Sequence, residues 1–266
     1  MSTHLYTVSL NEADMLGFFF RHYDPWVDRY YIYDDGSTDG TLELLRAHPR
    51  VTLRKFDRVH PDSFVDSHRV MQNESWKESR DVADWIVVTA IDEHLHCPGR
   101  TMRDYLDLCA AKGITCVPAL GYNMIAEDFP SPDALLHETH TRGATDPVMC
   151  KLGLFDPQAV VETGFVHGRH AAVPTGRIKY PERDELLLLH YKNLGRERTL
   201  KRHQFLAAGL RERDKANQWG HHYHWSAEEF SAGWENMAAK AVDITQGNPE
   251  EHGLPMSSRW WRQPPL

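Results

Sequence analysis

The sequence has few cysteines and no long apolar run. Its cysteines form no C-x-x-C pair, which disfavours a zinc ribbon or a dithiol redox centre, so we expect reduced thiols at Cys97, Cys109, Cys116 and Cys150. No stretch approaches the roughly 20 apolar residues of a membrane helix, and residues 1–10 lack the apolar core of a signal peptide. The sequence therefore predicts a cytoplasmic protein without a transmembrane segment.

Basic residues are also fewer than acidic residues in this sequence. The 30 lysines and arginines are outnumbered by 38 aspartates and glutamates, which argues against non-specific nucleic-acid binding. The 17 histidines contain no H-E-x-x-H motif or other closely spaced ligand set, which disfavours a histidine-based metalloprotein. With 41% hydrophobic residues, a chain of 266 residues is long enough for one large α/β domain, alone or with an appendage.

Residues 83–95 are the most informative stretch. The apolar run over 85–89 predicts a strand buried on both faces, as in a parallel sheet. Asp92 and Glu93 follow it, and ligands of open α/β sheets bind outside the carboxyl ends of strands. Adjacent carboxylates beside an apolar core are costly unless a positive charge meets them, as a metal bridging phosphates would. The alternative is a solvated turn.

The first half of the chain alternates between strand and helix patterns. We expect strands over 5–10, 30–33, 51–55 and 85–89, with helical segments between them. This alternation indicates an α/β fold with a mostly parallel, Rossmann-like sheet flanked by helices. Right-handed crossovers would bring 11–12, 34–35 and 92–93 to one crevice, although a polar surface could carry these side chains without function.

The second half predicts further short strands and then helices. We expect a helix over 101–111, a surface loop over 127–147, and strands over 114–117, 120–125, 151–155, 160–166 and 186–189. Helical patterns follow over 195–216 and 226–245. The sequence thus predicts a catalytic domain over 1–195, with a C-terminal helical region over 196–266 packed on it.

Three motifs taken together resemble family 2-type glycosyltransferases. They are N-E-A-D at 11–14, Y-I-Y-D-D-G-S-T-D-G-T at 31–41, and D-W-I-V at 84–87 with I-D-E-H-L at 91–95. The resemblance covers residues 1–125 well and 151–192 more loosely. It implies a GT-A fold, a nucleotide-sugar donor (most often a UDP-sugar), a saccharide or small-molecule acceptor, and Mn²⁺ or Mg²⁺.

The resemblance also implies roles for individual residues. Asn11 and Glu12 would lie near the base or ribose, and Asp35 would also contact the nucleoside. Asp92 matches the last acid of the family's Asp-x-Asp motif, which is the metal ligand. The first acid of that motif is Ala90 here, so a metal would have one aspartate ligand from the motif.

The later histidines are candidates for a second metal ligand. His190 ends an aliphatic run and resembles a late histidine that closes the metal site in several GT-A enzymes, and imidazole suits Mn²⁺ better than Mg²⁺. His167 and His170 are further candidates. A structural role for a lone histidine after a strand stays open.

Sugar transfer needs stabilisation of the leaving diphosphate and a base for the acceptor hydroxyl. Asp92 with a metal would meet the first need, and His190, Lys77, Arg80 or Lys192 would help. Inverting relatives use a later carboxylate as the base. We prefer Glu162, and Glu127, Asp128 and Asp146 are the alternatives.

The role of segment 217–225 and the choice among several functions stay open. The aromatic and polar segment 217–225 can stack on sugar rings or pack helices onto the domain. The competing functions are a nucleotidyltransferase, a sugar-nucleotide hydrolase, and an inactive nucleotide-sugar-binding module.

Overall fold

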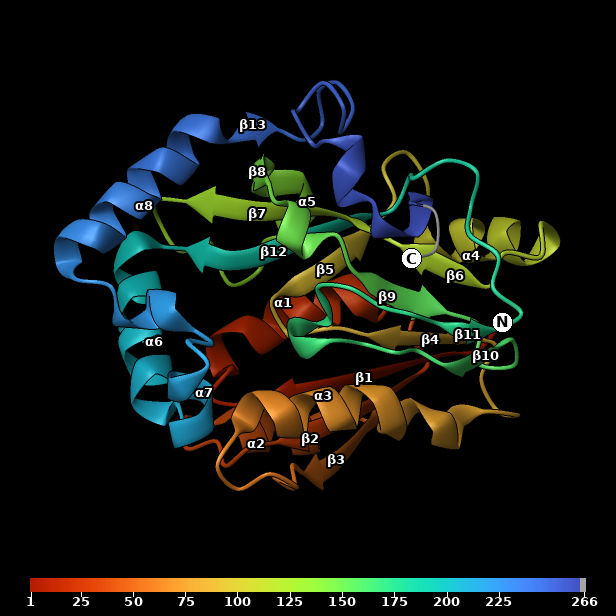
Figure 1. The fold of residues 1–266 in the computed structure, drawn as a ribbon, viewed down its shortest axis with the longest axis horizontal. Coiled ribbons are helices and arrows are strands. Elements are labelled where there is room, and N and C mark those ends of the chain that lie inside the picture. Colours follow the sequence, from red (N-terminus) through yellow and green to blue (C-terminus); the bar gives the residue numbers. More distant parts are fainter. Residues whose placement is uncertain (264–266) are drawn as a thin grey trace.

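The computed structural model describes residues 1–263 and contains two main sheets (Figure 1). The first sheet has the order β3-β2-β1-β4-β9-β6. Its strands are β1 (Thr3–Ser9), β2 (Arg29–Asp34), β3 (Val51–Lys55), β4 (Trp85–Val88), β6 (Cys116–Pro118) and β9 (Leu152–Phe155). The pairs β3-β2, β2-β1 and β1-β4 are parallel, whereas β9 is antiparallel to β4 and β6. The α/β fold with a parallel central sheet is confirmed.

The second sheet is mixed and has the order β13-β8-β7-β12-β5. Its strands are β5 (Glu93–His96), β7 (Leu120–Ala126), β8 (Arg142–Thr145), β12 (Leu187–Leu194) and β13 (Val242–Asp243). Only β7 and β12 are parallel neighbours. A small ribbon pairs β10 (Val160–Glu162) with β11 (Thr175–Gly176). The second half therefore departs from the parallel pattern of the first.

Helices cover both sheets. They are α1 (Ala13–Tyr23), α2 (Thr41–Ala47), α3 (Phe64–Glu74), α4 (Met102–Ala111), α5 (Leu136–Thr139), α6 (Arg196–Gly209), α7 (Glu212–Ala216) and α8 (Ala227–Lys240). Figure 1 shows α3 across the front of the first sheet, with α6, α7 and α8 together at one side of the molecule. No helix within residues 1–263 is long and apolar enough to cross a bilayer.

The main core joins the two sheets through α1. Met15, Leu16, Phe18 and Phe19 are buried on α1 and pack in one cluster with residues of β4, β7 and β12. The Tyr23 hydroxyl donates to the Glu93 carbonyl at 2.7 Å and accepts from the Leu95 N–H at 3.1 Å. This side chain satisfies two buried backbone groups of β5, so α1 holds the second sheet against the first.

Several sequence-based boundaries change in the structure. The expected loop over 127–147 contains α5 and β8, and the strand expected over 186–189 continues to Leu194. The strand expected over 160–166 ends at Glu162. Propensity could not reveal these features because strand ends depend on pairing partners far along the chain. The last three residues of the expected C-terminal region, 264–266, lie outside the described residues.

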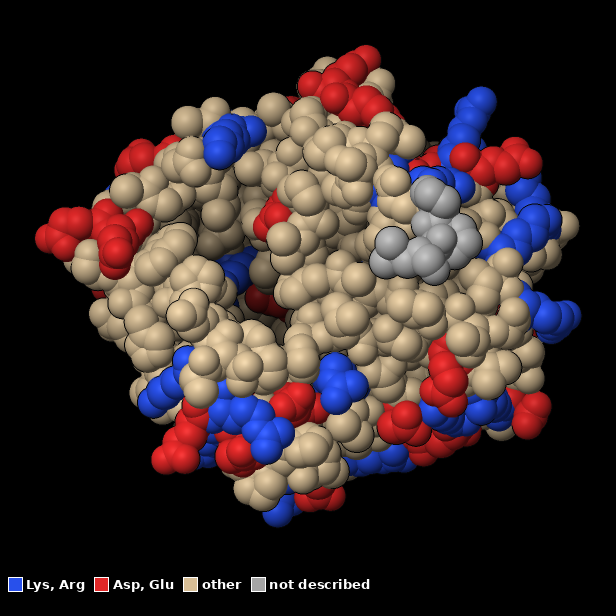
Figure 2. Space-filling model, in the orientation of Figure 1, with Lys and Arg blue, Asp and Glu red and all other residues tan. Residues whose placement is uncertain are grey.

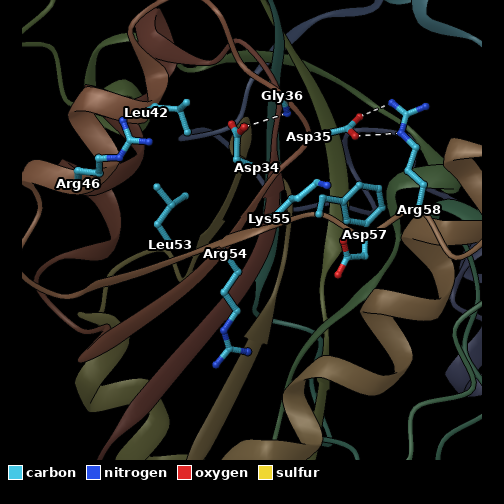
Figure 3. A pocket seen from close by; sticks show the side chains of 11 residues that line it. Asp34, Asp35, Gly36, Leu42, Arg46, Leu53, Arg54, Lys55, Asp57 and Arg58 are labelled. Carbon is cyan, nitrogen blue, oxygen red and sulfur yellow. Dashed lines mark hydrogen bonds and ion pairs between the residues drawn. The ribbon is translucent and has the colours of Figure 1, made fainter.

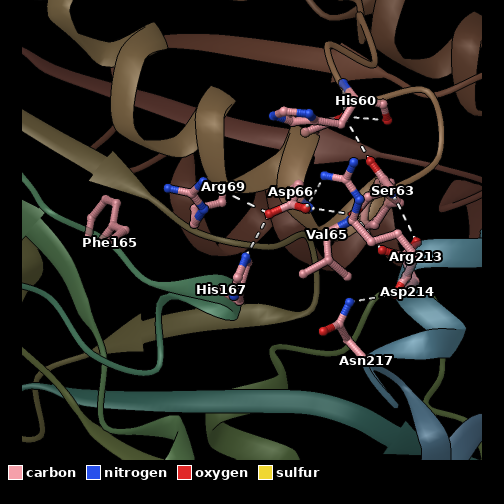
Figure 4. Close-up of polar contacts among 12 residues, drawn as sticks. His60, Ser63, Val65, Asp66, Arg69, Phe165, His167, Arg213, Asp214 and Asn217 are labelled. Carbon is pink, nitrogen blue, oxygen red and sulfur yellow. Dashed lines mark hydrogen bonds and ion pairs between the residues drawn. The ribbon is translucent and has the colours of Figure 1, made fainter.

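The C-terminal region is attached to the first sheet through the start of α3 (Figure 4). Ser63 caps α3 by accepting from the Asp66 N–H at 2.9 Å, and its hydroxyl donates to Asp214 Oδ1 at 2.6 Å. The buried Asp214 carboxylate of α7 also accepts from the Phe64 N–H at 3.0 Å and the Val65 N–H at 3.4 Å. An acid from α7 therefore satisfies the free donors at the N-terminus of α3.

Asp214→Ala should lower the free energy of unfolding by about 1–3 kcal/mol, because Ser63 and two backbone donors lose a buried acceptor. Urea denaturation measures the change. Asp107→Ala, on the exposed face of α4, is the control and should change the free energy by less than about 0.5 kcal/mol. Equal small losses in the two variants would contradict the capping role.

Candidate active site

The ends of β1 and β2 are interlocked by side chain to backbone hydrogen bonds. Asn11, which has a positive φ of 50°, accepts from the Thr38 N–H at 2.7 Å, and its own N–H donates to Ser37 Oγ at 2.9 Å. The Glu12 N–H donates to Thr41 Oγ1 at 2.8 Å. Residues 11–12 therefore contact residues 37–41, which closely follow the predicted 34–35 at the end of β2.

Asp34 and Asp35 have different surroundings at the end of β2. Asp34 Oδ2 accepts from the N–H groups of Gly36 and Ser37 at 2.8 and 3.0 Å, and these bonds close a turn. Gly36 has a positive φ of 93° in this turn, a conformation that glycine adopts readily. Asp35 forms a bidentate ion pair with Arg58 at 2.9 and 2.5 Å. Both acids line a surface cavity of ≈ 670 Å³ between the ends of β2 and β3 (Figure 3).

Asp92 and His190 face each other across the junction of the two sheets. Asp92 lies in the loop between β4 and β5, and its carbonyl accepts from the Tyr191 N–H at 2.7 Å. In the antiparallel register of β12 and β5, His190 is opposite Glu93. The resulting separation between His190 Nε2 and Asp92 Oδ2 is 3.4 Å, and both side chains are partly exposed.

The other nitrogen of His190 defines what this pair can hold. His190 Nδ1 lies 2.8 Å from the amide oxygen of Asn123, and this oxygen can only accept. A neutral ring then carries its proton on Nδ1 and presents the Nε2 lone pair to the Asp92 carboxylate. Two acceptors at this distance suit a cation between them, so the donor set fits a divalent metal.

The pair would need other groups to complete a metal site. In residues 1–263, no three His, Cys, Asp or Glu side chains come together as a metal-binding group. A metal would therefore have Asp92 and His190 as protein ligands, and water or phosphate oxygens as the remaining ligands, a pattern common for Mg²⁺. Burial works to raise the pKa of Asp92, but a protonated His190 and Lys192 offset it and hold the pKa below the ordinary value. A metal would bind the neutral form of His190, in place of the proton on Nε2.

Glu93 forms a buried ion cluster with partners other than Asp92 and His190. Its Oε1 accepts from Lys151 Nζ at 2.7 Å, and its Oε2 is paired with Arg169 and accepts from the Ala90 N–H at 3.1 Å. All three charged side chains are almost fully buried. Burial alone would raise the pKa of Glu93, but Arg169 and Lys151 hold it well below the usual range. The expectation that both adjacent acids meet one metal is thus corrected, because two protein cations neutralise Glu93.

The C-terminal region supplies charged and aromatic groups to the side of the molecule that carries Asn11, Glu12 and Lys192. Arg202 of α6 pairs with Glu12 and donates to the Asn11 carbonyl at 2.9 Å. Burial and the nearby Asp92, opposed by Arg202, raise the pKa of Glu12 to about 8. Lys192 Nζ lies 2.7 Å from His222 Nε2 and 4.6 Å from the centre of the Tyr223 ring. Figure 2 shows a hollow beside α6 with acidic and basic atoms at its floor.

Two of the predicted site residues lie elsewhere. Glu162, the preferred base, is on β10 and is paired with Lys77 at 2.7 Å, while Lys77 also pairs with Glu74 at 2.9 Å. Figure 1 shows β10 beside the N-terminus, at the opposite end of β4 from the loop that carries Asp92. The structure therefore does not bring Glu162 and Lys77 to the Asp92–His190 pair. Both were chosen from local sequence context, which does not show the end of the sheet at which a side chain lies.

Asp128 is exposed in the loop after β7, whereas the other remaining candidates have structural partners. His170 Nδ1 lies 2.8 Å from the Val148 carbonyl, and His167 pairs with Asp66 at 2.9 Å. Arg80 lies over the Trp76 ring at 4.9 Å, and Glu127 accepts from Trp234 at 3.0 Å. Asp146 accepts from Asn123 at 2.7 Å. In segment 217–225, Trp219 packs on His167 at 4.3 Å between ring centres, so this residue joins the C-terminal region to the domain.

Sequence reasoning missed four residues of the site region, namely Asn123, Lys151, Arg169 and Arg202. The signal for Asn123 was a single polar residue within the otherwise apolar strand β7. Lys151 directly precedes the fully buried strand β9, where an unpaired charge would be costly. The partners of these residues are distant in sequence, so only the fold could identify them.

Comparisons with known proteins add little to this geometry. No protein-family model and no curated protein matches the sequence. Solved structures of 4-diphosphocytidyl-2C-methyl-D-erythritol synthase are among the similar folds. The enzyme from Anaerococcus prevotii DSM 20548 aligns with 7% identity over 59% of this chain and 72% of its own, with a TM-score of 0.32. A second such structure aligns with 12% identity over 59% and 76%, with a TM-score of 0.31. At these values the likeness supports no statement about activity.

Glu93→Gln should lower the free energy of unfolding by about 3–5 kcal/mol, because Lys151 and Arg169 would be left as uncompensated buried cations. Chemical denaturation measures the loss. Glu78→Gln is the matched control, since Glu78 pairs with Arg54 at 2.6 Å on the surface and should contribute less than about 1 kcal/mol. A loss at Glu93 no larger than at Glu78 would contradict the buried-cluster account.

Proposed function

We propose that the protein is a metal-dependent glycosyltransferase that moves a sugar from a nucleoside-diphosphate sugar to an acceptor hydroxyl, with inversion. The observation that carries the proposal is the Asp92–His190 pair, separated by 3.4 Å at the carboxyl end of β4. This is the edge at which α/β sheets bind ligands. Mn²⁺ or Mg²⁺ is the proposed metal, and a UDP-sugar is the first donor to test.

The charges around the pair support a diphosphate ligand. A bound divalent ion would stabilise the negative charge that gathers on the leaving diphosphate. Lys192 forms no salt bridge among the described residues. Its Nζ lies 2.7 Å from His222 Nε2, and its other N–H groups can donate to phosphate oxygens. The Glu93 cluster adds one net positive charge nearby, because two cations surround one carboxylate. The region therefore favours anionic ligands.

The nucleoside would lie along the edge formed by Asn11, Glu12 and Asp35. Asn11 and Glu12 are held by the loop after β2, which makes this edge preorganised. Asp35 can bind a nucleoside donor group only by sharing its carboxylate with Arg58. The location of Glu162 removes the support for it as the base.

We also propose that two regions of the chain have different roles. Residues 1–195 would bind the donor and carry the metal ligands, and residues 196–263 would close the site from the other side. The contacts of Arg202 with Asn11 and Glu12, and of Lys192 with His222, support this division.

The reaction products distinguish the alternatives. A glycosyltransferase should release nucleoside diphosphate rapidly only when an acceptor is present. A sugar-nucleotide hydrolase would release product without an acceptor, and a nucleotidyltransferase would form pyrophosphate from a nucleoside triphosphate. A binding module would give a shift in melting temperature with a donor but no product. A screen of UDP-, GDP- and TDP-sugars with and without Mn²⁺ covers these outcomes.

Asp92→Asn should reduce transfer at least 100-fold and abolish the Mn²⁺-dependent rise in melting temperature with the donor, because the metal loses its carboxylate ligand. The measurement is nucleoside diphosphate release together with thermal shift. EDTA should have the same effect on the unaltered protein, and added Mn²⁺ should reverse it.

Asp84→Asn serves as the control, because Asp84 contacts Ser2 at the other end of β4. This variant should keep the donor response. Near-normal transfer by Asp92→Asn, with its unfolding unchanged, would contradict the metal role of Asp92.

A further inference from the structure

A row of hydrogen bonds connects His190 to an acid behind it. Asn123, on β7, is opposite His190 in the parallel register of β7 and β12. The Asn123 amide nitrogen donates to Asp146 Oδ2 at 2.7 Å, and its amide oxygen lies 2.8 Å from His190 Nδ1. Asp146 follows β8, and its other oxygen accepts from the Val148 N–H at 2.9 Å. Each polar atom of this row therefore has one partner.

The chemistry of these groups determines where the protons lie. A carboxylate can only accept, so Asn123 must present its NH₂ group to Asp146. The amide oxygen of Asn123 then faces His190, whose Nδ1 must carry a proton to donate. A neutral imidazole has one proton, so Nε2 is left with a lone pair. Nε2 lies 3.4 Å from Asp92 Oδ2.

We propose that Asp146 is a positioning residue that sets the tautomer of His190 through Asn123 and so makes His190 a metal ligand. Groups behind a metal-binding histidine commonly fix the ring and its tautomer in this way. The metal part of this inference rests on the proposed function, whereas the tautomer is a property of the metal-free protein.

If Asp146 were only a local cap, it would need only one of the two hydrogen bonds that its carboxylate accepts. As the cap of the short turn that begins at Pro147, Asp146 needs only Oδ1, which accepts from Val148. Asp146→Asn keeps an oxygen for that cap but turns the group facing Asn123 into a donor. Asn123 must then rotate its amide and donate to His190 Nδ1, which moves the ring proton to Nε2. The substitution therefore keeps the cap and changes only the row of hydrogen bonds that leads to His190.

The experiment is nitrogen NMR of histidine-labelled, metal-free protein at about pH 8. The unaltered protein should show His190 as the neutral Nδ1–H tautomer. Asp146→Asn should convert it to the Nε2–H tautomer. Electron paramagnetic resonance titration with Mn²⁺ alone should then show an affinity about 10–100-fold lower.

Asp156→Asn is the matched control. Asp156 accepts from the Gln158 N–H at 2.7 Å in the same local arrangement, but it follows β9 at the opposite end from Lys151. This variant should change neither the tautomer of His190 nor the Mn²⁺ affinity. Circular dichroism checks that both variants fold.

The outcomes separate this inference from the proposed function. An Nε2–H or doubly protonated His190 in the unaltered protein overturns the inference without any variant. An unchanged tautomer in folded Asp146→Asn also overturns it, even if Mn²⁺ binds at Asp92. A tautomer that switches as expected, in a protein that binds no Mn²⁺, supports the role of Asp146 and removes the metal from the proposed function.

Discussion

The buried Glu93 cluster is the constraint on which the rest of the site depends. Glu93 begins β5 in the second sheet, and Lys151 precedes β9 in the first. Arg169 reaches the same carboxylate from the turn after β10. Separating these groups would leave charges uncompensated in the interior, so the two sheets have one favourable arrangement at this junction. That arrangement sets the loop between β4 and β5, and with it the position of Asp92.

The site combines two kinds of electrostatic environment. Glu93 is saturated by protein cations, whereas Asp92 is partly exposed and faces a histidine nitrogen. Of the two adjacent acids, Glu93 therefore stabilises the fold, and Asp92 is the one proposed to bind a ligand. Lys192 of β12 adds positive charge near Asp92, and this charge is one reason for proposing a diphosphate ligand.

Much of the fold follows from sequence pattern, and less of the site does. The buried run of β4 and the polar ends of β1 and β2 predicted a parallel sheet with Asp92 at its edge, because periodicity and short connections are local properties. His190 was also selected, since it ends an aliphatic run. Glu162 was misplaced because the direction of β10 depends on pairing with β11, and Lys77, in the turn after α3, pairs with Glu162 at the same end of the sheet. The partners of Glu93 and the row of hydrogen bonds through Asn123 connect segments far apart in the chain, which no local pattern records.

The central claim is that a divalent ion bound by Asp92 and His190 holds a diphosphate at the carboxyl end of β4. The most direct measurement is a crystal structure of the protein with Mn²⁺ and a nucleoside diphosphate, with the metal located by its anomalous scattering. The account predicts one manganese peak within coordination distance of Asp92 and of Nε2 of His190, in contact with the phosphates. A peak and phosphates bound elsewhere, with Asp92 and His190 free, would contradict it.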